Sequence, residues 1–447
     1  MTARRTREAG GAVPTYLPAT DAAWLAPLLD PSGLATFLAG VPGSEASGVD
    51  GCIMKHVRYR PGSCCLVLFE ASVAGDPVSL YAVSPAHGRD PIPAEPGSSA
   101  PGRLLGGPVR WPGDSSVLRE FPLDARLSGL AALADPSALA SSIVTGAFAP
   151  GAAGPFAGEF RTLRYKPENR LVLKAELEWT NRNGGGRSAA SCLVRFEHHR
   201  SAGAEAALAG AFARAAAGRD LLAVPGAGTR LDDPGCTVLP WVPGADLARP
   251  VRYGDTGAAA LAGRALAEVA TLEVPGLPVR AAAAVLDELT SQVAVLEARP
   301  LGSDLEGRFA ALLSALGPGP DLPGEETVHG DFHQGQLLSH EGRVLMLDWD
   351  RAHRGDPTED YGNFLAQMHL LELRGRTAAG PPIDAFEAAF IAAGGKVPDP
   401  DRVRFWTARS LLELALREVR RLRRDWPHRA GVLLDRCGAV LEAGGAR

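Results

Sequence analysis

Residues 328–364 read VHGDFHQGQLLSHEGRVLMLDWDRAHRGDPTEDYGNF, and this stretch is the most informative about the fold. Asp331 follows its short apolar start, and Asp348 directly ends the apolar run at 344–347, after a tight turn at 340–342. Strands rarely end in buried carboxylates without a purpose, because an unpaired buried charge is costly. A loop carboxylate held close to a strand-end carboxylate is typical of a site for a divalent cation or for proton transfer.

The same stretch contains two separated motifs, HGDFHQGQ at 329–336 and LDW at 347–349. They resemble the catalytic segment of the aminoglycoside phosphotransferase and choline kinase superfamily. Its pattern is His-Gly-Asp-x-His-x-x-Asn, then a turn, an apolar residue, Asp and Trp or Phe. Gln336 stands where most of that superfamily has Asn, and the Gly-Gln ending is similar to maltokinases and bacterial glucosamine kinases. The resemblance implies a protein-kinase-like fold. It also implies an enzyme that uses ATP and Mg²⁺ to phosphorylate a hydroxyl group of a sugar, an amino sugar or an aminoglycoside.

The resemblance assigns a role to each polar residue of the stretch. Asp331 matches the catalytic base, because phosphoryl transfer needs a carboxylate that accepts or orients the attacking hydroxyl. Gln336 and Asp348 match the Mg²⁺ ligands, and both carry the side-chain oxygens that this ion prefers. The residues expected to support the loop are His329, His333, Asp350, Asp356 and Asp360.

Two histidines flank Asp331 and allow a different interpretation. His329 and His333 form a His-x-Asp-x-His pattern. Alternate residues on a strand point the same way, so this pattern is also typical of a zinc site and hence of a metallohydrolase. His340 and His353 are the only other nearby histidines. In the superfamily that the stretch resembles, the first histidine is structural and orients the loop.

The residues expected to bind the nucleotide come from the β-rich segment before this stretch. No P-loop motif occurs in the chain, which excludes a P-loop kinase. Kinase-like folds place a cation on the third strand, paired with a helix Glu, against the α- and β-phosphates. Arg195 and Glu205 match this pair, and Lys174 on the preceding strand is an equal alternative. Leu239 and Trp241 match the segment that links the two lobes, and the resemblance places them near the adenine.

Two departures from the family pattern leave a second class of function open. Arg195 stands where the family has Lys, and Arg is bulkier and bidentate. Residues 165–170, YKPENR, take the place of the phosphate-covering loop but are not rich in glycine. The alternative to an active kinase is therefore a non-catalytic kinase-like module that binds nucleotide and acts by interaction.

Apolar periodicity divides the chain into three parts and predicts an α+β fold. Residues 1–150 form a cap-like N-terminal module rich in β-structure, 151–246 a β-rich kinase N-lobe with the interlobe linker, and 247–447 a helical C-lobe. Together they predict a bilobal kinase-like fold preceded by a cap, which maltokinase-like proteins also carry. RYRP at 58–61 is echoed by RYKP at 164–167, which indicates an internal duplication of a small β-unit.

Composition narrows the class of protein. The chain has 447 residues with a net charge of −5, which is long enough for two or three domains. It has no apolar run of about 18 residues, which predicts no membrane-spanning helix. Its mild acidity predicts no nucleic-acid partner. Its six cysteines lack Cys-x-x-Cys spacing, which favours reduced thiols in the cytoplasm.

A group of arginines closes a late helix of the chain. Such a group could attract an anionic partner, but in an Arg-rich composition a solvated helix face is the favoured interpretation. Its members are Arg417, Arg420, Arg421, Arg423 and Arg424.

Overall fold

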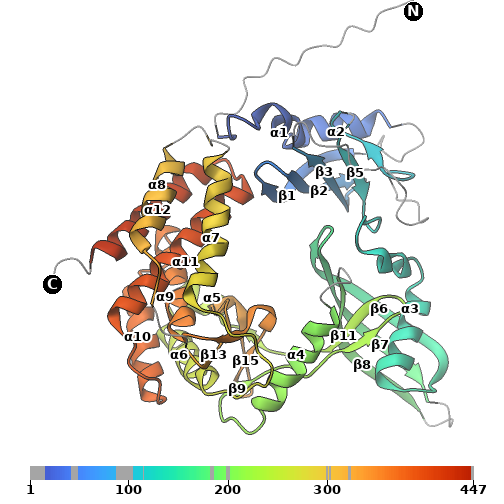
Figure 1. Cartoon of the computed structure of the whole chain (residues 1–447). Helices are drawn as coiled ribbons and strands as arrows, with labels where there is room; N and C mark the ends of the chain where they lie inside the picture. Colours follow the sequence, from blue (N-terminus) through green and yellow to red (C-terminus); the bar gives the residue numbers. More distant parts are fainter. Residues whose placement is uncertain are drawn as a thin grey trace, which may run out of the picture.

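Figure 1 shows a computed structural model of the chain. It describes residues 16–41, 49–86, 104–113, 115–181, 186–197, 202–298, 301, 304–320 and 324–443. A β-rich cap lies at the top of the view, a β-rich N-lobe at the lower right and a helical C-lobe at the left. The predicted fold class, an α+β bilobal kinase-like fold preceded by a cap, is confirmed. The boundaries at 150 and 246 stay predictions.

The cap consists of two short helices over an antiparallel sheet with the strand order β1-β2-β3-β5-β4. Asp30 starts the second helix, because its carboxylate accepts a hydrogen bond from the backbone N–H of Ser32. Tyr59 anchors the first helix through a hydrogen bond from its hydroxyl to Asp21. The elements are α1 (Ala22–Leu28), α2 (Pro31–Ala39), β1 (Val49–Arg60), β2 (Cys64–Val73), β3 (Asp76–Pro85), β4 (Val109–Arg110) and β5 (Val117–Glu120).

The N-lobe is built on a second antiparallel sheet, of order β10-β11-β8-β7-β6. Alternate residues of its central strands are buried against α3, as in Leu171, Leu173 and Ala175. Residues 127–148 therefore contribute to this core, although they precede the predicted lobe boundary. The elements are a 3₁₀ helix (Ser128–Ala134), α3 (Pro136–Ile143), a π-helical turn (Val144–Phe148), β6 (Ala153–Lys166), β7 (Arg170–Thr180), β8 (Arg187–Glu197), α4 (Ala202–Ala215), β10 (Thr229–Leu231) and β11 (Cys236–Pro240).

The cap sheet and the N-lobe sheet share one topology. In chain order, each runs as three antiparallel neighbours, and the fifth strand then pairs with both the third and the fourth. The repeated Arg-Tyr sequence ends the first strand in both copies, at β1 and at β6. In both copies the tyrosine hydroxyl donates to an aspartate, Tyr59 to Asp21 and Tyr165 to Asp124. The echo in the sequence thus corresponds to the same local structure in two places.

The C-lobe carries the helices and two small sheets, one of order β12-β14-β15-β9 and one of β13 and β16. Its strands are β9 (Leu222–Ala223), β12 (Ala245–Asp246), β13 (Glu326–Val328), β14 (Leu337–His340), β15 (Arg343–Met346) and β16 (His353–Gly355). Its helices are α5 (Ala248–Arg252), α6 (Thr256–Ala270), α7 (Ala282–Glu297), α8 (Leu305–Leu316), α9 (Thr358–Leu373), α10 (Gly380–Ala392), α11 (Pro400–Arg421) and α12 (Trp426–Glu442), with 3₁₀ turns at Gln334–Gln336 and Trp349–Arg351. Within the described ranges, no helix has both the length and the apolar character needed to cross a lipid bilayer.

One buried apolar cluster joins the cap to the C-lobe. It extends from the cap residues Leu25 and Phe69 to Leu411 on α11 and Leu433 on α12. The indole N–H of Trp426 also donates to the carbonyl of Tyr16, which fastens the start of the described chain to α12. The cap is therefore held on the C-lobe by burial of apolar surface. It lies beside the end of α11, which carries the group of arginines.

Candidate active site

The predicted catalytic hairpin is present, and it contacts the N-lobe as well as the C-lobe. Strands β14 and β15 pair antiparallel, and the apolar residues Val344 to Met346 are buried. The backbone N–H of Leu347 donates to the carbonyl of Gln336 at 2.9 Å, which closes the hairpin at its open end. This pairing places Asp348 beside the loop 329–336, because the strand that ends in Asp348 runs alongside the one that begins after Gln336.

Asp360 binds the backbone of the catalytic loop through two hydrogen bonds. Its two carboxylate oxygens accept hydrogen bonds from the backbone N–H groups of His329, at 2.6 Å, and Gly330, at 2.9 Å. The side chain is fully buried, and this burial raises the pKa of Asp360 to about 7. The backbone of the loop is therefore bonded to a carboxylate at the start of α9, and the supporting role of Asp360 stays a prediction.

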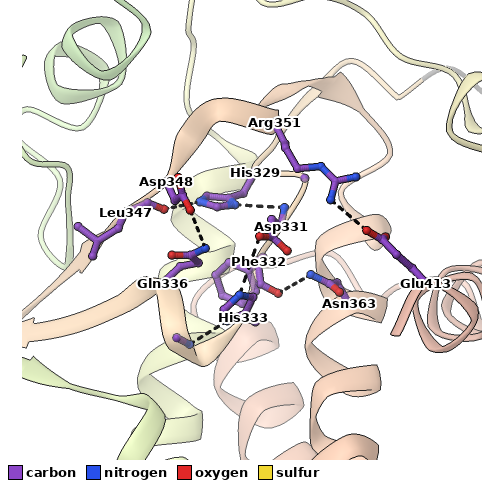
Figure 2. Close-up of polar contacts among 12 residues, drawn as sticks. His329, Asp331, Phe332, His333, Gln336, Leu347, Asp348, Arg351, Asn363 and Glu413 are labelled. Carbon is purple, nitrogen blue, oxygen red and sulfur yellow. Dashed lines mark hydrogen bonds and ion pairs between the residues drawn. The ribbon is translucent and has the colours of Figure 1, made fainter. Parts of the chain in front are cut away.

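His329 orients the loop from inside. Its Nδ1 accepts a hydrogen bond from the backbone N–H of Asp331, and its Nε2 donates to the carbonyl of Leu347 at 2.8 Å (Figure 2). Burial lowers the pKa of His329, so the ring is neutral, with its proton on Nε2. Because both ring nitrogens are already bonded within the protein, neither has a lone pair left for zinc, and this geometry opposes the zinc-site interpretation.

His333 lies next to the predicted catalytic base. Its Nε2 is 3.9 Å from a carboxylate oxygen of Asp331, and its Nδ1 accepts from the backbone N–H of Gly335. Burial lowers the pKa of His333, with the Asp331 charge acting in the opposite direction. Asn363, which the sequence did not indicate, donates from its side chain to the carbonyl of Phe332 and holds the middle of the loop (Figure 2).

Asp348 adopts a left-handed backbone conformation with φ of 64° at the end of the hairpin. Gln336 donates from its amide to the Asp348 carboxylate at 3.2 Å, and the Arg170 guanidinium lies 3.8 Å from it. Burial would raise the pKa of Asp348, but the Arg170 charge and the Gln336 hydrogen bond together lower it. The ionised carboxylate and the neighbouring amide group fit Mg²⁺, which binds to proteins through few oxygen ligands.

Two contacts lock the hairpin against the rest of the molecule. Trp349 stacks on Phe212 of α4, with ring centroids 3.8 Å apart and an interplanar angle of 22°. Asp356 is buried, accepts from the backbone N–H of Thr358 and receives the indole N–H of Trp406 at 3.0 Å. Asp356 thus bonds to the start of α9 and to α11, and Asp350 is exposed on a 3₁₀ turn; the supporting roles of both stay predictions.

An ion-pair network connects the hairpin to α11. Arg351 lies 3.2 Å from the carboxylate of Glu413 (Figure 2), and Arg409 of the same helix lies 2.9 Å from it. Burial would raise the pKa of Glu413, but the charges of Arg409, Arg351 and Arg417 lower it to about 2. The contact between Arg351 and Glu413 was not predictable from local sequence, because the two residues lie in separate segments of the C-lobe.

A cavity of about 570 Å³ opens over the loop and takes its walls from three parts of the chain. The catalytic hairpin contributes Asp331, Gln336 and Asp348. Most of the other charged or titratable side chains that line it are cationic: Arg58 of the cap, Arg164 and Lys166 of β6, and Arg417, Arg420 and Arg421 of α11, with His56 of β1 beside them. The carboxylates therefore sit at the base of a strongly positive cavity, which suits the phosphates of a nucleotide.

The cations of the N-lobe that line the cavity differ from those expected from the sequence. Arg195 is paired with Glu197 at 3.2 Å, and Lys174 is paired with Glu176 at 2.6 Å. Neither Arg195 nor Lys174 is among the described residues that line the cavity. Lys166 lines it instead, and burial together with the Arg164 and Arg170 charges lowers the pKa of Lys166 to about 8.

The expected adenine side lies further along the N-lobe. Lys174 sits over the ring of Trp241, 4.5 Å from its centroid, in a cation–π contact. Leu239 is half-buried on β11, two residues before Trp241. Glu205 belongs to α4, but its side chain lies outside the described residues. The nucleotide-binding roles of these residues and of Arg195 stay predictions.

The expectation of a solvated arginine face on the late helix is wrong for three of its five members. Arg417, Arg420 and Arg421 are half-buried and line the cavity above the catalytic loop. Arg423 and Arg424 are exposed beyond the end of α11. The difference arises because the cap and the hairpin meet over this end of α11, which the sequence of the helix alone does not reveal.

The chain resembles known proteins over the part that contains the hairpin. Residues 178–406 match the family described as "Phosphotransferase enzyme family". No curated protein matches the chain in sequence.

Solved structures also resemble it. A choline/ethanolamine kinase family protein from Mesorhizobium loti is 18% identical, with 69% of this chain and 95% of that chain covered and a TM-score of 0.46. A choline kinase from Cryptosporidium parvum Iowa II is 8% identical, with 69% and 96% covered and a TM-score of 0.48. The amicoumacin kinase hAmiN, in complex with AMP-PNP, Ca²⁺ and Ami, is 13% identical, with 64% and 89% covered and a TM-score of 0.43.

Proposed function

The chain belongs to the phosphotransferase enzyme family, and from this premise we propose that it transfers the γ-phosphoryl group of ATP to a hydroxyl group of a small molecule. The acceptors that the Gly-Gln motif indicates are sugars, amino sugars and aminoglycosides. The proposal rests on one observation above all: Asp331, Gln336 and Asp348 line a single cavity whose other charged walls are cationic. The unpaired cysteines agree with a reducing compartment such as the cytoplasm.

Each residue of the site has a part in the proposed reaction. The acceptor hydroxyl oxygen forms a bond to the γ-phosphorus while the bond to the β–γ bridging oxygen breaks and ADP leaves. Asp331 accepts the hydroxyl proton. Asp348 and Gln336 would hold Mg²⁺, which when bound supplies positive charge to the phosphate oxygens. Lys166 adds a fixed positive charge from the β6–β7 hairpin, the position that covers the phosphates in kinase-like folds.

A second candidate function is a kinase-like module that binds nucleotide without turnover. One observation favours it: the Arg170 guanidinium lies 3.8 Å from the Asp348 carboxylate, at the place where Mg²⁺ would bind. An arginine that neutralises Asp348 competes with the metal, because both need the same oxygens. If the chain is an active kinase, Arg170 has to move away from Asp348 when MgATP binds.

Measurement of ATP consumption separates the two functions. The purified protein is mixed with MgATP and with glucosamine, maltose, kanamycin, choline, glucuronate or glucose 6-phosphate, and ADP release is followed beside the Asp331→Asn variant. Asp331→Asn keeps the side-chain volume but removes the base, so we expect it to bind ATP and to lose turnover by about 100-fold or more. Stabilisation of the wild type by MgATP without any ADP release would support the binding module. Absence of both would refute both candidate functions.

A further inference from the structure

A second cavity, of about 620 Å³, lies against the other side of the catalytic loop. Its walls come from α5, α9, α11 and α12, and it shares His333, Gly335, Arg417 and Arg421 with the cavity above Asp331. None of the described residues that line it belongs to the cap, to the β6–β7 hairpin or to the Asp348 end of the catalytic hairpin. This cavity therefore lies away from the cap and β6–β7 walls that we propose for the nucleotide, and it is open to the acceptor.

Arginine dominates the charge of this second cavity. Seven arginines line it, against two carboxylates, those of Glu418 and Asp425. Both carboxylates are already compensated. Glu418 is buried between Arg374, at 2.8 Å, and Arg421, at 3.5 Å, and Asp425 is paired with Arg429. The remaining positive charge has no carboxylate in the described lining to offset it, so a ligand of the cavity meets a net positive field.

Arg417 is one of the two arginines, with Arg421, that line both cavities. It is half-buried, and it forms no hydrogen bond or ion pair with any residue that the structure describes. Its charge and that of Asp331 both act on the ring of His333, in opposite directions. Arg417 thus stands at the junction of the cavities, beside the residue that neighbours the catalytic base.

We propose that the acceptor is a hydroxyl compound that carries an anionic group, a phosphate or a carboxylate, which Arg417 and Arg421 bind at the junction of the two cavities. The inference rests on the proposed phosphotransfer and narrows its acceptor. A guanidinium group binds either anion through two parallel hydrogen bonds, and a half-buried guanidinium that forms no hydrogen bond to the described residues favours such a partner. The same field opposes cationic acceptors such as amino sugars and aminoglycosides. Sugar acids and sugar phosphates fit both the hydroxyl requirement and the charge.

The anion site is tested first without any reaction. Binding of inorganic phosphate and of acetate is measured by calorimetry at constant ionic strength on the wild type, Arg417→Gln, Lys166→Gln and Arg424→Gln. Arg424 is the matched control, because it is an exposed arginine that lines neither cavity. Loss of one charge-assisted contact weakens binding by about tenfold or more. We expect this loss in Arg417→Gln and not in Arg424→Gln. Binding that depends on Lys166 but not on Arg417 would place the anion on the nucleotide side and overturn the inference, as would absence of binding.

Turnover then distinguishes the class of acceptor. Glucose, glucosamine, glucuronate and glucose 6-phosphate share one ring and differ in charge, and each is supplied with MgATP. We expect kcat/KM for an anionic member to exceed that for glucose or glucosamine by about tenfold or more, with the better anion identifying the group bound. Arg417→Gln should raise the KM for that acceptor about tenfold and that for ATP by less than about twofold.

Different results would refute the anionic acceptor and the proposed phosphotransfer. Higher kcat/KM for glucosamine than for the anions overturns the anionic acceptor while the proposed phosphotransfer stands. Phosphate binding that depends on Arg417, without turnover of any member of the panel, supports the anion site and counts against the proposed reaction on these sugars.

Discussion

Gly330 is the position where one methyl group should damage catalysis most directly. Its φ is 78°, a conformation that residues with a Cβ atom adopt only at a cost. A Cβ atom at this position would lie 2.5 Å from the carbonyl oxygen of Arg351. The residue immediately precedes Asp331, and its backbone N–H is held by Asp360. We therefore predict that Gly330→Ala displaces the catalytic carboxylate without touching its chemistry.

The magnitude follows from the geometry. The left-handed conformation costs an alanine about 1–2 kcal/mol. Real Cβ contacts essentially never fall below 3.0 Å, so relief of the overlap requires a movement of at least 3.0 − 2.5 = 0.5 Å. Because a misplacement of about 1 Å in an active site can lower the rate about 100-fold, we expect a loss in kcat of about tenfold. ATP affinity should change less than kcat, because the overlap involves Gly330 and Arg351 and neither Gln336 nor Asp348.

Gly342→Ala is the matched control for this experiment. Gly342 has a φ of 77°, but no atom lies within 4 Å of where its Cβ would be. It therefore carries the same conformational cost without the overlap. Both variants are compared with the wild type for ADP release with the best acceptor and for ATP binding by calorimetry. Equal kcat values for Gly330→Ala and Gly342→Ala, with both proteins folded, would refute the claim that overlap with Arg351 displaces Asp331.

Three further predictions concern charge and packing around the site. Burial and the Arg164 charge lower the pKa of Lys166 to about 8, so ATP affinity should fall by up to about tenfold per pH unit above that value, and calorimetry should show no such fall for Lys166→Arg. Burial raises the pKa of Asp360 from 3.8 to about 7, so its contribution to stability is greatest below about pH 4 and is lost as the pH rises through 7. Urea unfolding should therefore show a decline of up to about 4 kcal/mol over that range that Asp360→Asn lacks, and equal slopes for both proteins would contradict the burial argument. Phe212→Ala removes the buried ring that stacks on Trp349 and should lower the free energy of unfolding by about 3–5 kcal/mol, whereas a loss below about 1 kcal/mol would show that the stack does not hold the hairpin.

The catalytic hairpin was predictable because its residues are close together in the chain. Asp331, Gln336 and Asp348 lie within a single loop and the two strands that follow it, so the turn between the strands brings them together whatever the rest of the molecule does. The contacts that His329 and Asp360 make with the loop also lie within the 328–364 stretch. The helical C-lobe and the two β-rich segments were predictable from apolar periodicity, which local sequence carries.

The cations of the site were not predictable in the same way. The strand register puts Lys166, Lys174 and Arg195 on the same face of the N-lobe sheet, because Lys166 pairs with Arg170 and Val172 pairs with Arg195. Lys166 lines the cavity with Asp348 because it stands at the β6–β7 turn, whose Pro167 and Asn169 also line the cavity. The sequence of a strand does not say which of its ends meets the other lobe. The three half-buried arginines of α11 were misjudged because helix periodicity does not say which other segment covers a helix end.

The phosphotransferase class could be predicted from local sequence, because the two motifs of the 328–364 stretch carry the candidate base and the candidate metal ligands and short-range backbone geometry brings these together. The charge of their surroundings depends instead on the tertiary structure. The chain as a whole has a net charge of −5, yet Arg58 of the cap, Lys166 of the N-lobe and Arg417 of α11 meet over the same loop. A sum over the chain contains no information about where charges gather, because local potential depends on distances that only folding establishes.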